Sequence, residues 1–187
     1  MERVCNGSLN VIGRVGEVEP PHLVHPITIE PKKPRMCHDE RFLNLWIKDC
    51  PFTLDYITDL PRYVDQDHYK TTFDDKSGYD HIQLHPSSST YFGLEWGGWY
   101  FSYATLPFGW KASAYIYHTV GMAATHFARS NGVPCSQYID DRHACQLRLP
   151  RACVNQFSNF QLAQMAAFAA CSVLISLGYF ISLKKVS

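Results

Sequence analysis

The sequence predicts an α+β fold, because β-hairpin patterns alternate along it with long helical patterns. Aromatic residues over positions 91–103 flank Gly97-Gly98, a two-residue turn of the kind that closes hairpins. Apolar or small residues recur at helical spacing over positions 109–129. A second hairpin pattern covers positions 135–147. A chain of 187 residues is long enough for one domain, or for one domain and part of another.

Short elements are predicted in the N-terminal part of the chain. Positions 9–15 and 22–30 have the pattern of short strands on either side of a proline turn. Positions 31–35 predict a basic connection interrupted by prolines, and positions 41–47 predict a short helix.

The middle and C-terminal parts complete the predicted elements. Thr53 is the predicted N-cap of a helix that Pro61 closes. Positions 70–75 predict a strand. A helix over positions 160–177 and a final strand over positions 179–183 end the chain.

Two pairs of adjacent aspartates stand at predicted strand ends. Asp74 and Asp75 end the 70–75 strand, and Asp140 and Asp141 lie at the tip of the second hairpin. Neighbouring carboxylates repel each other and burial raises their pKa values, and a divalent cation such as Mg²⁺ relieves both costs. If the two strands are neighbours in one sheet, the carboxylates converge and suit a two-metal site for phosphoryl transfer. Otherwise the pairs are two unrelated surface turns.

The composition indicates a folded protein without net charge. Apolar residues make up 46% of the chain, and 17 basic residues balance 17 acidic ones. A nucleic-acid enzyme is expected to be basic somewhere, so such a surface would depend on local clusters or on a missing segment. The seven scattered cysteines form no CxxC motif, which favours reduced thiols and an intracellular protein, in cytoplasm or nucleus. The N-terminal residues lack the apolar run of a signal peptide.

One segment is long enough to cross a membrane. Positions 162–183 contain no charged residue. They also contain Gln164, several serines and many alanines, and their strongly apolar part, positions 173–177, is short. A buried helix followed by a strand fits this segment better, so we expect no membrane partner.

The order of these motifs closely resembles that of reverse transcriptases, over about residues 30–187. Positions 33–35 followed by positions 39–44 resemble the fingers motif of the family. The residues within these motifs are most similar to those of retrotransposons of the tyrosine-recombinase, DIRS-like branch. The other motifs that carry the resemblance are the acidic strand, the aromatic hairpin, the helix start Leu106-Pro107-Phe108-Gly109-Trp110-Lys111, the hairpin Tyr138-Ile139-Asp140-Asp141, and Leu177-Gly178-Tyr179 before Lys184-Lys185.

The resemblance implies the fingers and palm subdomains of a right-hand polymerase, with an antiparallel palm sheet backed by helices. Residues 1–70 and 86–106 correspond to the fingers, and residues 71–85 and 107–187 correspond to the palm. The thumb and ribonuclease H parts of full-length relatives are absent from this sequence. We therefore expect little processive synthesis from this chain alone.

The resemblance also implies catalytic residues. Asp74, Asp140 and Asp141 match the ligands of two Mg²⁺ ions, with Mn²⁺ as an alternative. Because side chains alternate along a strand, Asp141 points away from the face of Asp140 unless the turn bends it back, which favours Asp140 as a direct ligand. Asp75 falls at a variable position whose main-chain carbonyl can touch the metal. Lys184, or the lysine after it, resembles the lysine near the leaving pyrophosphate.

A further group of residues resembles the nucleotide-binding positions of the family. Tyr79, which follows Gly78 at the family's spacing, resembles the aromatic gate that lies against the sugar and disfavours ribonucleotides. Arg35 resembles the triphosphate-binding arginine, whose planar fork suits phosphate. Phe108 and Gly109 resemble contacts to the nucleotide and template. The plainer alternatives are a core tyrosine, a solvated charge and a simple helix start.

The implied activity is RNA-directed DNA synthesis, which transfers deoxynucleoside triphosphates to the 3′-hydroxyl of a primer on an RNA or DNA template. Two alternatives remain. One is an inactive retrotransposon remnant that keeps the fold without catalysis, and the other is an unrelated two-metal nuclease or phosphatase. Hydrolysis needs neither the Tyr79 gate nor the Phe108-Gly109 helix start, so these residues disfavour the second alternative.

Overall fold

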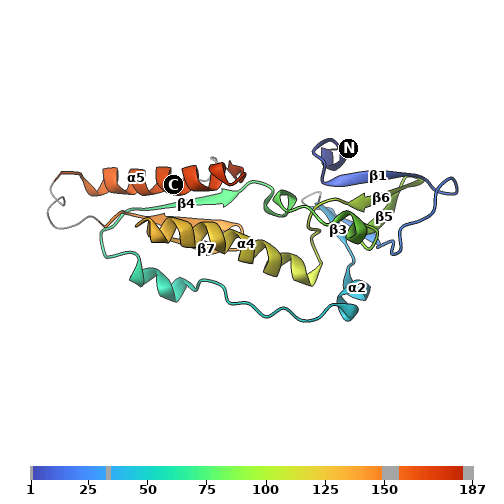
Figure 1. Ribbon diagram of the computed structural model, residues 1–187, viewed down its shortest axis with the longest axis horizontal. Coiled ribbons are helices and arrows are strands. Elements are labelled where there is room, and N and C mark those ends of the chain that lie inside the picture. The colour runs from blue at the N-terminus through green and yellow to red at the C-terminus, as the bar shows by residue number, and fades with distance from the viewer. Residues whose placement is uncertain (1, 33–34, 149–155, 183–187) are drawn as a thin grey trace. The chain divides into compact units, whose positions relative to one another are not determined.

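The computed structural model describes residues 2–32, 35–148 and 156–182 (Figure 1). The chain divides into two compact units, each of mixed α and β structure. Unit 1 comprises Met1–Cys50 and Tyr79–Tyr115, and unit 2 comprises Pro51–Gly78 and Ile116–Ser187. Three helical segments are short: α1 (Glu2–Cys5), which precedes the first strand, the 3₁₀ helix η2 (Gly78–His81) and α3 (Pro86–Ser89).

Unit 1 contains a three-stranded antiparallel sheet in the order β1-β6-β5. β1 is Leu9–Arg14, β5 is Gly93–Trp96 and β6 is Trp99–Tyr103. Gly97 and Gly98 have φ angles of 59° and 78°, the two positive values that a type I′ hairpin turn requires. The aromatic hairpin and the first strand of the sequence are therefore confirmed.

Unit 1 also contains a two-stranded sheet and a short helix. β2 (Ile27–Glu30) pairs with β3 (Arg35–His38), and α2 (Arg41–Trp46) follows as predicted. The strand predicted over positions 22–30 begins only at Ile27, after Pro26, which has no amide hydrogen to give to a ladder. The predicted connection over positions 31–35 is also shorter, because Arg35 already pairs with Glu30.

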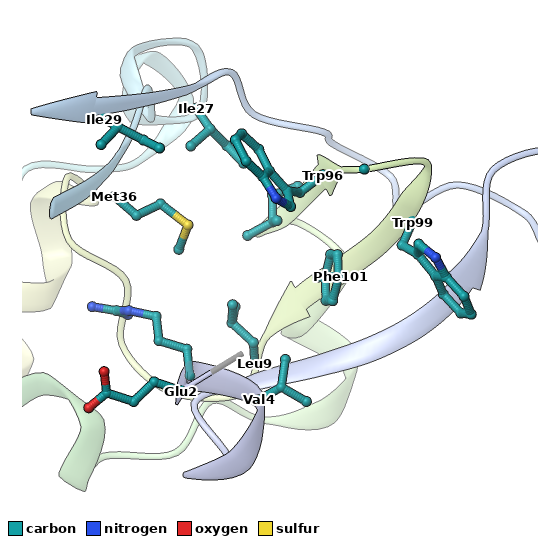
Figure 2. Close-up of a pocket in the computed structure, with 12 residues that line it drawn as sticks. Glu2, Val4, Leu9, Ile27, Ile29, Met36, Trp96, Trp99 and Phe101 are labelled. Atoms are coloured by element: carbon teal, nitrogen blue, oxygen red, sulfur yellow. The ribbon is translucent and has the colours of Figure 1, made fainter. Parts of the chain in front are cut away.

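A cavity of about 640 Å³ opens beside the core of unit 1. Figure 2 shows its largely apolar lining, with Met36 and Trp96 directed towards the space. The buried cluster next to it consists of Leu9, Leu43, Phe92, Leu94 and Tyr103.

Unit 2 is built on a four-stranded antiparallel sheet in the order β7-β8-β4-β9. The predicted 70–75 strand is confirmed as β4, while the predicted final strand is short. The strands are β4 (Lys70–Asp75), β7 (Cys135–Tyr138), β8 (Asp141–Cys145) and β9 (Ile181–Ser182).

Two long helices cover one face of this sheet. α4 (Lys111–Ser130) and α5 (Asn159–Ser176) confirm the two predicted helical patterns. Residues of both helices, among them Thr125 and Leu174, line a small void together with Phe73 and Arg142 of the sheet. Figure 1 shows α5 running along β4, which it contacts. We call this helix-covered side the inner face of the sheet and the opposite side its outer face.

The helix predicted from Thr53 to Pro61 is wrong. The chain forms a 3₁₀ helix instead, η1 (Ile57–Arg62), with Tyr56 at its N-cap and Pro61 inside it. An isolated segment this short does not sustain an α-helix without tertiary contacts, and proline removes a further hydrogen bond.

α5 is long and apolar enough to cross a membrane by length and composition, with a mean hydropathy of 1.3 over Asn159–Ser176. Its side chains Leu162, Ala166 and Leu174 are buried, and the helix contacts β8 and β4. The core helix of a folded unit meets the same two criteria. The expected lack of a membrane partner stays a prediction.

Candidate active site

The two acidic strand ends lie side by side in unit 2. β4 and β8 are antiparallel neighbours, and Asp74 stands directly opposite Asp141 in register. Cross-strand partners share one face of a sheet, so both carboxylates lie on the outer face. Asp74 is half-buried and Asp141 is exposed. The predicted convergence of the acidic strands in one sheet is confirmed.

A tight turn places the third aspartate. Tyr138 and Asp141 form the last pair of the β7–β8 hairpin, so Ile139 and Asp140 are its two turn residues. Ile139 has a φ of 55°, as the first central position of a type II′ turn requires, although a β-branched residue rarely adopts it. Gln137 Nε2 supports the turn by donating to the Ile139 carbonyl at 2.9 Å.

This turn changes the expected geometry of the acidic pair. Strand alternation through position 141 predicted Asp140 as the aspartate that faces Asp74. The strand ends at Tyr138 instead, and Asp141 begins the next strand as the register partner of Asp74. The reason is the positive φ at Ile139, which interrupts the alternation. Asp140 is exposed beside them.

The second residue of the first acidic pair points inward. Asp75 is 4% exposed, and Arg142 Nε donates to its two carboxylate oxygens at 2.8 and 2.9 Å. The Tyr117 hydroxyl donates to the same carboxylate. Burial lowers the pKa of Arg142, but the hydrogen bond and charge of Asp75 outweigh it and leave that pKa above its usual value. Burial, and then the charge of Asp75, raise the pKa of Tyr117.

A cavity of about 270 Å³ on the outer face includes Asp141. His143, two residues along β8, lines the same cavity. Burial and the charge of Lys70 lower the pKa of His143 below its usual 6.5, so the ring is neutral at pH 7.

Gly78 lies close to this site, and close packing favours glycine at its position. A Cβ atom at this position would lie 3.0 Å from the Tyr117 hydroxyl and 3.5 Å from Asp140 Cβ. Ser77 before it has a φ of 56°, which turns the chain sharply after β4. The strand β4 therefore ends at Asp75.

The other sequence-predicted residues lie in unit 1. The rings of Tyr79 and Phe108 contact each other, with centroids 4.6 Å apart, and Phe108 is 56% exposed. Arg35 is the first residue of β3, opposite Glu30. Lys184 lies outside the described residues.

Gly109 has a structural requirement that the sequence did not reveal. Its φ is 98°, and a Cβ atom would lie 3.1 Å from the His38 carbonyl oxygen. Asn44 Nδ2 donates to the Gly109 carbonyl at 2.8 Å, while Asn44 Oδ1 accepts from the Lys111 amide at 2.9 Å. Asn44 therefore holds the start of α4, a role for which no local sequence signal exists because the partners are more than sixty positions apart.

Within residues 2–32, 35–148 and 156–182, no group of three or more His, Cys, Asp or Glu side chains is placed to hold a metal. Asp74 and Asp141 nevertheless offer carboxylate oxygens, which are the type of ligand that Mg²⁺ takes. This ion takes oxygen ligands, keeps several waters and is commonly bound by one or two carboxylates together with substrate phosphates.

No family model matches the sequence, and no curated protein matches it. Solved structures are similar over almost the whole chain. A crystal structure of the prototype foamy virus protease-reverse transcriptase has a TM-score of 0.71 at 20% identity, covering 99% of this chain and 22% of that chain. The foamy viral protease-reverse transcriptase dRH in complex with double-stranded DNA has a TM-score of 0.73 at 18% identity, with coverages of 99% and 29%.

A third structure, the foamy viral protease-reverse transcriptase in complex with double-stranded DNA, has a TM-score of 0.69 at 20% identity. The present chain spans 22% to 35% of the length of these three solved chains. At such identities the likeness concerns the fold alone. The chain has a reverse transcriptase-like fold of mixed α and β elements with antiparallel sheets.

Proposed function

We propose that this chain, with its reverse transcriptase-like fold, is the fingers-and-palm part of an RNA-directed DNA polymerase of a retrotransposon. In this proposal residues 1–70 and 86–106 supply the fingers, and residues 71–85 and 107–187 supply the palm. The observation that carries it is the opposition of Asp74 and Asp141 in register, beside the Ile139-Asp140 turn and on the outer face of a helix-backed antiparallel sheet.

Asp74 and Asp141 would hold divalent cations through their carboxylates, with Asp140 as a further ligand at the turn. Bound Mg²⁺, or Mn²⁺ in its place, would activate a primer 3′-hydroxyl and stabilise the charge on the reacting phosphate. The protein contributes rigid placement, since β4 and β8 are paired up to their acidic ends.

Residues of unit 1 would bind the incoming deoxynucleoside triphosphate. Tyr79 is held against Phe108, so its ring has a fixed position from which it would exclude a 2′-hydroxyl. The positive φ of Gly109 and the two Asn44 hydrogen bonds hold the loop that carries Phe108. Arg35 would contact the triphosphate, as its planar fork suits phosphate.

The proposed partner is a template-primer duplex of RNA or DNA. Support comes from the two solved relatives in complex with double-stranded DNA. The zero net charge of this chain means that any phosphate contacts would depend on local basic residues.

Single-nucleotide addition tests the proposal. The purified chain is incubated at high concentration with a primed RNA template, Mg²⁺ and one deoxynucleoside triphosphate. Asp74→Asn and Asp141→Asn are expected to lower the rate by at least about a hundredfold, because each removes a charged oxygen ligand. Asp67→Asn is the matched control: Asp67 is exposed, and its φ of 69° suits asparagine as well as aspartate.

Addition that is insensitive to Asp74→Asn would refute the proposed function. A second candidate is a non-catalytic remnant that keeps the fold, favoured by the lack of a three-ligand group among the residues that the structure describes. Binding of the duplex without any Asp74-dependent addition would support that candidate. Shortening of the labelled strand in place of its extension would indicate a nuclease.

A further inference from the structure

A buried ion pair lies directly behind the acidic strand ends. Asp75 follows Asp74 on β4 and Arg142 follows Asp141 on β8, and each of the pair is 4% exposed. Because side chains alternate, Asp75 and Arg142 point to the inner face while their neighbours point to the outer face. The proposed chemistry uses neither member of this pair.

The contacts of the pair join three strands and a helix. Arg142 Nε donates to the two carboxylate oxygens of Asp75 at 2.8 and 2.9 Å. Tyr117 of α4 donates its hydroxyl to Asp75. Arg142 Nη1 lies 3.3 Å from Thr125 Oγ1 of α4 and 3.4 Å from Gln137 Oε1 of β7.

The main chain adds a second connection at the same place. The Asp75 amide donates to the Asp140 carbonyl at 3.0 Å, which ties the end of β4 to the turn. The Tyr117 hydroxyl also lies against Gly78, just after β4. Asp75 is therefore held through its side chain to β8 and α4, and through its amide to the turn that carries Asp140.

The stability of the fold does not require a charged pair at the positions of Asp75 and Arg142. Apolar residues of similar volume are often as stabilising as a buried ion pair, or more so. The Nε of Arg142 is shared between the two oxygens of Asp75, while Nη1 reaches Thr125 and Gln137. Partners on both sides therefore fix the plane of the guanidinium group and give direction to the strands that carry the pair. Arg142 also neutralises the charge of Asp75 on the inner face.

We propose that the Asp75–Arg142 pair, oriented by Tyr117, is a positioning device that holds the carboxylates of Asp74 and Asp141 at the separation that a bound divalent cation requires. The inference rests on the proposed function of the outer face. The side chains of Asp75, Arg142 and Tyr117 act through Asp74 and Asp141 and touch no substrate themselves.

The decisive variant replaces both charges by apolar side chains of similar size, Asp75→Leu with Arg142→Met. Its thermal midpoint is expected to stay near that of the unchanged chain. The Mn²⁺ concentration at which half of the protein is bound, measured by electron paramagnetic resonance with Mn²⁺ alone, is expected to rise about tenfold or more. The rate of single-nucleotide addition is expected to fall by roughly ten- to a hundredfold. Asp65→Leu with Arg148→Met, the same changes at an exposed pair 3.4 Å apart in unit 2, is the control.

Tyr117→Phe gives a milder version that keeps both charges, with an expected rise of about threefold in half-saturating Mn²⁺. It decides the matter if the double variant does not fold. Unchanged Mn²⁺ binding in a folded double variant and in Tyr117→Phe would overturn the proposal.

Amide hydrogen exchange separates this inference from the proposed function. If the unchanged chain neither binds Mn²⁺ nor adds nucleotides, the proposed function fails. In that case the exchange rate of the Asp75 amide, which donates to the Asp140 carbonyl, still tests whether the ion pair holds the strand ends in place. If the Asp75 amide exchanges at least about tenfold faster in the double variant than in the unchanged chain, while exchange in α5 is the same, the positioning role is supported. Equal exchange rates of the Asp75 amide in the two proteins contradict it.

Discussion

Gly121 stands in the middle of α4 against a fully buried amide. A Cβ atom at this position would lie 2.3 Å from Gln137 Nε2. Gln137 is 0% exposed, donates to the Ile139 carbonyl at 2.9 Å and accepts from the Thr125 hydroxyl at 3.1 Å. The amide therefore cannot move aside without losing hydrogen bonds inside the core.

Gly121→Ala is expected to lower the free energy of unfolding by about 1–3 kcal/mol, measured by urea denaturation. Helix propensity alone predicts the opposite sign, since alanine is better than glycine by about 1 kcal/mol in a helix. In a Gln137→Ala background the same change is expected to be neutral or stabilising, because the clash is gone. A stabilising effect with Gln137 intact would show that the amide yields freely.

Tyr79 offers a test of sugar selection that depends on the proposed function. Tyr79→Ala removes the ring that packs on Phe108, so ribonucleotides are expected to be added about ten- to a hundredfold more readily relative to deoxynucleotides. Single-nucleotide addition with the two sugars measures the ratio. Tyr91→Ala, at a tyrosine that is 45% exposed elsewhere in unit 1, is the control. An unchanged ratio would remove Tyr79 from the gate role.

At the scale of elements, local signals predicted the structure well where they were strong. Gly97-Gly98 and the helical spacing over positions 109–129 each specify a turn or a helix without help from distant residues. The segment from Thr53 failed because so short a run depends on tertiary contacts for its form, and those contacts yield a 3₁₀ helix at Ile57–Arg62.

The candidate site was predictable in part for the same reason. Adjacent aspartates at two strand ends are visible in the sequence, and their pairing in one sheet follows the predicted topology. The orientation of Asp141 depends on the positive φ of Ile139, which its residue type does not suggest. The pairing of Asp75 with Arg142 joins positions 67 apart and has no local pattern.

α5 makes a sharp contrast between its two sides. Ala166 is 0% exposed against the sheet, whereas Phe168 is 76% exposed. Ala166→Asp is expected to lower the free energy of unfolding by more than about 3 kcal/mol, because it buries an unpaired charge. Phe168→Asp is expected to change it by less than about 1 kcal/mol. Thermal unfolding followed by circular dichroism measures both, and equal effects would show that α5 is not seated as described.

At the scale of the whole molecule, charge limits how the chain can bind a nucleic acid. The 17 basic and 17 acidic residues cancel, so few phosphates can be neutralised at once. The logarithm of duplex affinity is expected to fall with the logarithm of salt concentration with a slope shallower than about −3, or roughly three phosphate contacts. Fluorescence anisotropy with a labelled duplex, at salt concentrations from about 50 to about 200 mM, measures this slope. A slope near −6 would reveal a concentrated basic surface.

The tandem aspartates of β4 have a consequence for how the sheet assembles. Sliding β4 by one residue along β8 would exchange the two faces, yet it would put Asp75 where Asp74 had been, so the acidic end looks alike in both alignments. Thr71 and Thr72 are equally interchangeable. Phe73, which is 2% exposed, is the residue of β4 that tells the two alignments apart. Phe73→Thr is therefore expected to populate both, with doubled amide resonances along β4 in nuclear magnetic resonance spectra, whereas Phe73→Leu keeps a single set.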